Sequence, residues 1–190
     1  MQVLQVWNND TLPDVFHGCI KTVYDLCCVN GLEYTMVCRR GDLFSDFSNA
    51  KIVNYDSFME GKDIEWWRNI LNRYESQADF VRLEYAKTTP DLFYIDTDVE
   101  LKYIPEFQDN GKPYFGMYWN HINFHVLYVN RNTAFFVKLL DEMQKTHPPF
   151  DWLVFMRYFA IHYRKGLPKF NDVNIIPEDC CIQNNFKKRN

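Results

Sequence analysis

A short apolar run at residues 92–95, which ends at Asp96 and Asp98, constrains the fold more than any other feature of the sequence. A strand that is apolar at every position must be covered on both faces, as central strands of parallel sheets are when helices pack on each side. Thr89 and Pro90 end the helical pattern that precedes the run. We therefore expect a buried strand at 92–95 within an α/β sheet, with Asp96 and Asp98 at its carboxyl end.

The remaining pattern agrees with an α/β fold. The chain begins with a strand, a helix and a strand, which favours a parallel pair joined by a right-handed crossover. No internal repeat and no linker rich in Pro, Gly or Ser divides the sequence, so we expect one domain over residues 1–190, with a mostly parallel central sheet flanked by helices. The expected strands are 3–7, 33–38, 51–54, 92–95, 114–118, 124–129 and 173–176. The expected helices are 13–29, 133–145 and 151–163, and residues 63–87 are expected to form two helices that meet near Ser76.

The composition narrows the class of protein. A hydrophobic fraction of 47% and an aromatic fraction of 17% indicate a compact globular chain. The net charge of −4 argues against nucleic acid as a partner, because binding phosphates in general requires Lys and Arg gathered on one face. No stretch approaches about 18 uninterrupted apolar residues, so we expect no transmembrane segment. The six cysteines lack the spacing of zinc sites, which favours reduced thiols and a cytoplasmic location.

The Asp-x-Asp spacing is weak evidence taken alone. The chain contains 16 Asp, so chance produces about one such spacing. Its position carries more weight, because open α/β sheets bind ligands outside the carboxyl ends of their strands. Two carboxylates suit Mg²⁺ or Mn²⁺, which fill their other positions with water and substrate phosphates. Asp96 and Asp98 are therefore predicted to bind a divalent metal that holds a phosphorylated ligand.

Two segments, 78–82 (Ala-Asp-Phe-Val-Arg) and 94–100 (Tyr-Ile-Asp-Thr-Asp-Val-Glu), resemble the sugar-binding region of DXD glycosyltransferases of GT-A fold. The pattern is most similar to that of the Och1-like mannosyltransferases, the capsular polysaccharide transferases and the clostridial glucosylating toxins. In that group an Asp and an Arg three residues apart on a helix contact the donor sugar, and a Tyr precedes the first metal-side Asp by two residues. The resemblance implies donor-sugar contacts by Asp79, Arg82 and Tyr94, and a nucleotide contact by Asp96.

Looser matches extend the resemblance. The segment Gln5-Val6-Trp7 is similar to the first strand of these enzymes, in which an aromatic residue stacks on the base, so these three residues are predicted to bind the nucleotide. Asn123 resembles the family's Asn that precedes a strand and touches the sugar.

The sequence departs from the family pattern at two places. Residues 89–91 (Thr-Pro-Asp) stand where the family usually has Gly-Gly before its Tyr. The family's metal-completing segment near the carboxyl end, rich in Ser, Trp or His, has no clear counterpart, and Asn184 and His162 are candidates for a third ligand.

The function that the resemblance implies is metal-dependent transfer of a hexose from a UDP- or GDP-linked sugar to a glycan or protein hydroxyl. The families that the sequence resembles retain the anomeric configuration, so retention is expected by resemblance alone, and no catalytic residue is assigned. Two alternatives stay open. A strand followed by Asp-Thr-Asp-Val also fits a haloacid-dehalogenase-like phosphatase, in which Asp96 would attack phosphate. A glycan- or nucleotide-binding protein of the same fold without turnover is the other alternative.

Overall fold

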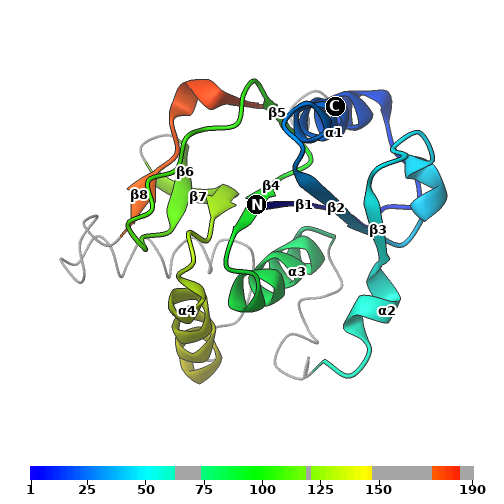
Figure 1. Cartoon of the computed structure of the whole chain (residues 1–190). Coiled ribbons are helices and arrows are strands. Elements are labelled where there is room, and N and C mark those ends of the chain that lie inside the picture. The colour runs from blue at the N-terminus through cyan, green and yellow to red at the C-terminus, as the bar shows by residue number, and fades with distance from the viewer. Residues whose placement is uncertain (63–73, 119–120, 147–172, 185–190) are drawn as a thin grey trace.

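A computed structural model describes residues 1–62, 74–118, 121–146 and 173–184 of the chain, and its centre is a twisted sheet (Figure 1). In the described residues the sheet has seven strands in the order β3-β2-β1-β4-β7-β6-β8. The strands are β1 (Gln2–Trp7), β2 (Glu33–Cys38), β3 (Lys51–Asn54), β4 (Leu92–Ile95), β6 (Tyr114–Tyr118), β7 (His121–Tyr128) and β8 (Asn174–Ile175).

The strand directions agree with the mostly parallel sheet expected from the sequence. β1 is parallel to β2 and β4, and β3 is parallel to β2. β7 is antiparallel to both β4 and β6, while β8 pairs parallel with β6. The carboxyl ends of β1, β2 and β4 therefore meet at one edge of the sheet.

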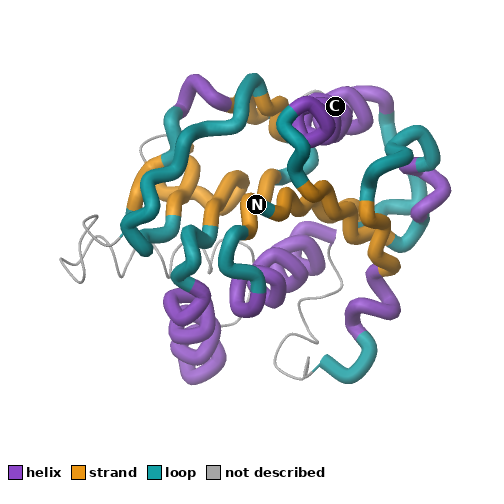
Figure 2. The backbone as a smooth tube through the Cα atoms, in the orientation of Figure 1, coloured by secondary structure: helices purple, strands orange, loops and turns teal. Residues whose placement is uncertain are grey.

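Helices lie on both faces of the sheet (Figures 1 and 2). One face is covered by α1 (Asp14–Val29). The other is covered by α3 (Tyr74–Thr88) and α4 (Thr133–Thr146). The short helices α2 (Tyr55–Met59) and η1 (Gly41–Phe44) flank β3.

The apolar side chains of β1 alternate between the two faces, so both sides of this strand are buried. Val3 and Trp7 pack in a cluster with Ile20 of α1, whereas Leu4 and Val6 pack in a second cluster that contains residues of α3 and α4. All four residues of β4 are likewise buried. Burial on both faces explains why the apolar run at 92–95 could be recognised as a central strand.

A second, two-stranded sheet joins two distant segments of the chain. β5 (Val99–Leu101) follows the Asp96 turn and pairs antiparallel with β9 (Cys181–Gln183), so that Leu101 lies opposite Cys181. The 3-10 helix η4 (Glu178–Cys180) leads into β9. This small sheet, which we did not predict, brings the segment around Asn184 beside the aspartate turn.

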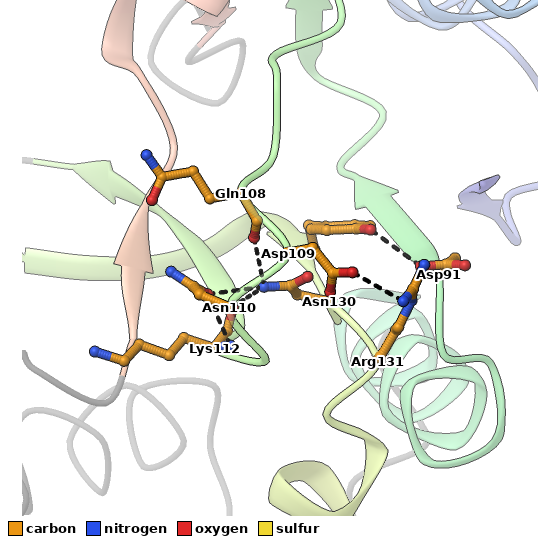
Figure 3. A network of polar contacts seen from close by, with 8 residues as sticks. Asp91, Gln108, Asp109, Asn110, Lys112, Asn130 and Arg131 are labelled. Carbon is orange, nitrogen blue, oxygen red and sulfur yellow. Dashed lines mark hydrogen bonds and ion pairs between the residues drawn. The ribbon is translucent and has the colours of Figure 1, made fainter.

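A polar network fastens the opposite edge of the sheet. Asn130 has a φ of 50°, a left-handed conformation that Asn tolerates better than most residues. Its buried Nδ2 donates to the carbonyl of Gln108 at 3.1 Å, to Oδ1 of Asn110 at 3.1 Å and to the carbonyl of Lys112 at 2.7 Å (Figure 3). The network fixes the loop before β6 onto the end of β7.

Charged side chains extend this network toward β4. Arg131 donates to Asp109 at 2.9 Å and lies 3.8 Å from Asp91, which precedes β4 (Figure 3). Tyr128 also donates to Asp91, at 3.1 Å. Asp91 and Asp96 stand at opposite ends of β4, so the network supports the fold away from the aspartate turn.

Most expected elements are present, with small shifts at their ends. The strand expected at 124–129 begins earlier, at His121, and the strand expected at 173–176 is shorter. Of the two helices expected over 63–87, the second is present as α3, whereas residues 63–73 and the helix expected at 151–163 lie outside the described residues. Within the described ranges, none of the helices combines the length and the apolar character that crossing a membrane requires.

Candidate functional site

The turn that carries Asp96 and Asp98 begins directly after β4 and is held by backbone hydrogen bonds. The Asp96 N–H donates to the carbonyl of His125 on β7 at 2.7 Å, and the Val99 N–H donates to the Asp96 carbonyl at 3.2 Å. Nε2 of Gln5 donates to the same carbonyl at 3.3 Å. Both aspartates are half-buried. β1, β4 and β7 thus fix the turn while its carboxylates remain accessible.

Arg82 of α3 is the centre of a buried polar cluster. Its side chain is 4% exposed, and its guanidinium forms an ion pair with Asp79 one turn earlier on the helix. Nη1 lies 3.6 Å from Oδ1 of Asp96 and donates to the carbonyl of Phe124 on β7 at 2.5 Å. Burying a guanidinium is costly unless it is paired and hydrogen-bonded. Arg82 therefore joins α3 to both β4 and β7 in one defined position.

Tyr94 completes the cluster. Its hydroxyl donates to Oδ1 of Asp96 at 2.5 Å, and the Arg82 guanidinium carbon lies 4.7 Å from the centre of its ring, within the range of a cation–π contact. Burial, and next the charge of Asp96, raise the pKa of Tyr94 well above its usual value. The phenol therefore stays protonated at neutral pH and remains a hydrogen-bond donor to Asp96.

Acidic side chains gather around the turn. Among the described residues, Asp79 and Asp96 both face Arg82, and Asp98 stands two residues beyond Asp96. Carboxylate oxygens in this arrangement are the donor set that hard cations such as Mg²⁺ and Mn²⁺ prefer. Among the described residues, no group of three or more His, Cys, Asp and Glu side chains is arranged to hold a metal ion.

The predicted nucleotide-binding residues lie at the same edge of the sheet. Gln5 is fully buried and accepts a hydrogen bond from the Tyr34 hydroxyl at 2.9 Å while it donates to Asp96. Val6 is part of the core. Trp7 is 5% exposed, with its ring centre 4.9 Å from that of Phe16. The structure places all three in β1, and base stacking by Trp7 stays a prediction.

The structure describes two of the three remaining site candidates. Asn123 lies in β7, where its backbone pairs with Gly116 and it precedes Phe124, the residue whose carbonyl binds Arg82. The N–H of Asn184 donates to the Asp98 carbonyl at 2.8 Å, while its side chain donates to Glu100 at 2.8 Å. His162 lies outside the described residues.

Asn8 was missed in the sequence. It follows Trp7 at the carboxyl end of β1 and is 4% exposed, yet neither Nδ2 nor Oδ1 of its amide has a hydrogen-bond partner among the described residues. A buried amide without partners costs stability, so such groups are rare in folded proteins. The run Trp-Asn-Asn-Asp has the composition of an ordinary turn, and for that reason nothing in the sequence distinguished Asn8.

The fold and the site together define a class of protein. A mostly parallel sheet with helices on both faces, and polar groups gathered where β1 and β4 end, is the architecture of α/β proteins that bind ligands at the carboxyl edge of the sheet. The sequence matches no protein-family model and no curated protein sequence.

Glycosyltransferases of known structure share this fold. The glycosyltransferase PaToxG superposes with a TM-score of 0.64 and 14% identity, over 87% of this chain and 68% of that one. The galactosyltransferase LgtC, solved in complex with donor and acceptor sugar analogues, has a TM-score of 0.51 and 13% identity, over 95% of this chain and 86% of that one. For the bifunctional glycosyltransferase WbbM the TM-score is 0.53 and the identity 10%, over 93% of this chain and 38% of that one.

These likenesses concern the fold. The chain has the GT-A fold of nucleotide-diphospho-sugar transferases, as the sequence resemblance implied. At identities of 10–14% the likeness does not extend to substrate or chemistry.

Proposed function

We propose that residues 1–190 form one GT-A glycosyltransferase domain that transfers a hexose from a UDP- or GDP-linked sugar to a hydroxyl of a glycan or protein. The observation that carries this proposal is the single network formed by Asp79, Arg82, Tyr94 and Asp96. The resemblance specified these four residues by their offsets along the chain, and offsets alone do not require their side chains to touch. The fold supports the same conclusion.

The donor sugar is assigned to the side of the site formed by α3 and β7. Asp79 offers carboxylate oxygens and Arg82 offers N–H donors, which together match sugar hydroxyls that both donate and accept hydrogen bonds. Nε of Arg82 is buried without an acceptor among the described residues, so the guanidinium retains a donor that its protein partners do not use. Tyr94 and Asn123 complete the proposed sugar contacts.

The nucleotide is assigned to the end of β1. Gln5, Val6 and Trp7 line this position in our proposal, together with Asp96 from β4. We add Asn8, because its buried amide offers a donor nitrogen and an acceptor oxygen that no described protein group satisfies. Uracil and guanine both present an N–H donor beside a carbonyl acceptor, so an Asn amide can pair with either. This complementarity supports a UDP or GDP donor without distinguishing the two.

The divalent cation, Mn²⁺ or Mg²⁺, is assigned to Asp96 and Asp98. Tyr94 and Arg82 both approach Oδ1 of Asp96, which leaves Oδ2 as the oxygen for a cation to approach. The residues present therefore fit a hard cation held by two carboxylates and completed by phosphate and water oxygens. When bound, such an ion stabilises the negative charge of the departing nucleoside diphosphate. Asp96 and Asp98 orient the diphosphate, and Arg82 orients the sugar against it.

The stereochemical outcome and the cell compartment are parts of the same proposal. Retention of anomeric configuration follows from the families that the sequence resembles. A cytoplasmic location is supported by the six cysteines, all of which are free thiols in the structure, since reducing compartments keep thiols in that form.

The products of a donor screen test the proposal. UDP- and GDP-linked hexoses are incubated with the protein and Mn²⁺, and the released nucleoside diphosphate and inorganic phosphate are measured separately. A transferase, or its slow hydrolysis of the donor, releases nucleoside diphosphate, and Asp98→Asn abolishes that release. Release of inorganic phosphate would instead identify the phosphatase alternative, and binding without any product would identify a non-catalytic binding protein.

A further inference from the structure

The segment that follows the aspartate turn is fastened along its length to the residues just before position 185. β5 pairs antiparallel with β9. At one end of this pairing the Asn184 N–H donates to the Asp98 carbonyl at 2.8 Å, and at the other the Lys102 N–H donates to the Cys180 carbonyl at 2.8 Å. Residues 98–102 therefore lie in one fixed register against residues 180–184.

The side chain of Asn184 adds two contacts to this pairing. Its Nδ2 donates to Oε1 of Glu100 at 2.8 Å and to Sγ of Cys19 on α1 at 3.6 Å. Hydrogen bonds to an ionised acceptor are stronger than those between neutral groups. Asn184 and Glu100 are both partly buried, so water competes less for this bond than it does at the surface. The amide thus connects the end of β9 to both β5 and α1.

Helix α1 supports the remainder of β5. The Leu101 N–H donates to Oγ1 of Thr22 at 3.1 Å, and that hydroxyl donates to the Cys19 carbonyl at 2.8 Å. Val99 and Leu101 are buried in one cluster with Ile20 of α1. Thr22 therefore fixes the far end of β5, while Asn184 fixes the beginning of the strand, next to Asp98.

The two aspartates are consequently held from opposite sides. The Asp96 N–H donates to the His125 carbonyl on β7, whereas the Asp98 carbonyl accepts from Asn184 beyond β9. Two carboxylates can share one cation only at a particular separation, so the cation depends on both supports. Groups that orient metal ligands without touching the metal typically change its affinity by about 10–100-fold when they are removed.

We propose that Asn184 is a positioning residue for the divalent cation: it holds the Asp98 backbone so that the carboxylates of Asp96 and Asp98 keep the separation that one ion requires. This inference rests on the proposed assignment of the cation to these two aspartates. Asn184 acts here through Asp98 and Glu100, and its amide nitrogen serves as a hydrogen-bond donor. Direct ligation by its Oδ1 is the alternative that the experiment separates.

The first measurement is the affinity of the whole chain for Mn²⁺ alone, with the free ion measured by electron paramagnetic resonance. Asn184→Ala removes the side-chain contacts but keeps the backbone N–H, and it should weaken Mn²⁺ binding about tenfold, the lower end of the range for orienting groups. Tyr103→Phe is the matched control. It removes the 2.7 Å hydrogen bond to Asp179 between the same two segments, further from Asp98, and should bind Mn²⁺ as the wild type does.

Variants of Glu100 separate positioning from ligation. Glu100→Gln and Glu100→Ala both remove the charge, but Gln keeps an acceptor oxygen for the Asn184 amide. Asn184→Ala should therefore weaken Mn²⁺ binding about tenfold when combined with Glu100→Gln and have little effect when combined with Glu100→Ala, because residues in contact are coupled. An equal loss in both backgrounds would show that Asn184 binds the ion directly and would overturn the positioning role.

Hydrogen exchange in the wild type gives a measurement that does not depend on how any variant folds. Coupling between two sites is reciprocal, so saturating Mg²⁺ should slow amide exchange in peptides that cover residues 181–184, by up to about tenfold. Exchange that ignores Mg²⁺, unchanged Mn²⁺ affinity in Asn184→Ala, or an equal loss in Tyr103→Phe would overturn the inference alone. A wild-type protein that binds no Mn²⁺ would refute the proposed cation site and this inference with it.

Discussion

The hydroxyl of Tyr94 donates a 2.5 Å hydrogen bond to Oδ1 of Asp96, two residues further along the chain. In an extended strand, residues i and i+2 point to the same face, so a tyrosine at this offset can reach the first residue beyond the strand end. Tyr94 thereby orients the carboxylate that we assign to the metal and nucleotide. The Arg82 guanidinium stacks on the same ring, so one aromatic residue connects the sugar side of the site to the metal side.

Tyr94→Phe isolates this hydrogen bond, because it keeps the ring and its cation–π contact. Asp96 is one-third exposed, so water can replace part of the lost interaction, and we expect about 1 kcal/mol, or about fivefold weaker binding of the metal–nucleotide complex. Isothermal titration calorimetry measures the affinity. An unchanged dissociation constant would mean that Tyr94 does not orient Asp96 in solution.

Arg82 and Asp79 should depend on each other. Arg82→Ala leaves the buried Asp79 carboxylate without its partner, which we expect to cost about 3–5 kcal/mol of unfolding free energy. The double variant with Asp79→Asn should recover part of that loss. Chemical denaturation measures both. The exposed i,i+4 pair of Lys21 and Asp25 on α1 is the matched control, and Lys21→Ala should change stability little. Equal effects at the two pairs would contradict a buried network.

Binding separates the sugar role of Arg82 from its structural role. Arg82→Lys keeps the positive charge but loses the planar group of donors. It should weaken binding of the complete nucleotide sugar more than binding of the bare nucleoside diphosphate. Equal loss for both ligands would refute a contact between Arg82 and the sugar.

Asn8→Ala should affect stability and binding in opposite ways. Removing a buried amide that has no hydrogen-bond partner is expected to leave the melting temperature unchanged or raise it, since no interaction is lost and an unsatisfied group disappears. Nucleotide affinity should nevertheless fall. Asn9→Ala, one residue further and only half-buried, is the control for both. A destabilised Asn8→Ala protein with full nucleotide affinity would assign Asn8 to the fold alone.

The network around Asn130 should affect stability without affecting binding. Asn130→Ala removes the amide group whose two N–H donors serve three acceptors and places alanine at a φ of 50°, for an expected loss of about 2–3 kcal/mol. Asn130→Gly loses the same bonds but adopts this backbone freely, so it should be about 1 kcal/mol less destabilising. Urea denaturation measures both. If the two variants were equally stable, backbone conformation would not contribute at this position.

The parts of the fold that the sequence predicted are those with strong local signals. β4 is apolar at every position and bounded by turn residues, and β1, α1 and β2 follow as a strand–helix–strand unit. β5 and β9 were missed because three-residue strands have no usable periodicity and their pairing joins Leu101 to Cys181, far apart in sequence. Only the assembled chain creates that contact.

The sequence predicted those site residues that lie close together along the chain. Asp79 and Arg82 lie on one turn of α3, and Asp96 follows β4 two residues after Tyr94, so offsets along the chain specified them. The hydrogen bond from Arg82 to the Phe124 carbonyl depends on the antiparallel pairing of β4 with β7, which no local pattern encodes. Asn8 became a candidate only through its burial without partners.

The central claim is that Asp96 and Asp98 hold a divalent cation that binds a nucleotide sugar. Calorimetric titration of UDP- and GDP-linked hexoses, with Mn²⁺ present and then with Mn²⁺ removed by chelation, tests it most directly. We predict at least one donor whose binding requires Mn²⁺ and is lost in Asp98→Asn, while Asp109→Asn, at the opposite edge of the sheet, binds as the wild type does. Tight binding of donors that is indifferent to Mn²⁺ and to Asp98→Asn would contradict the account.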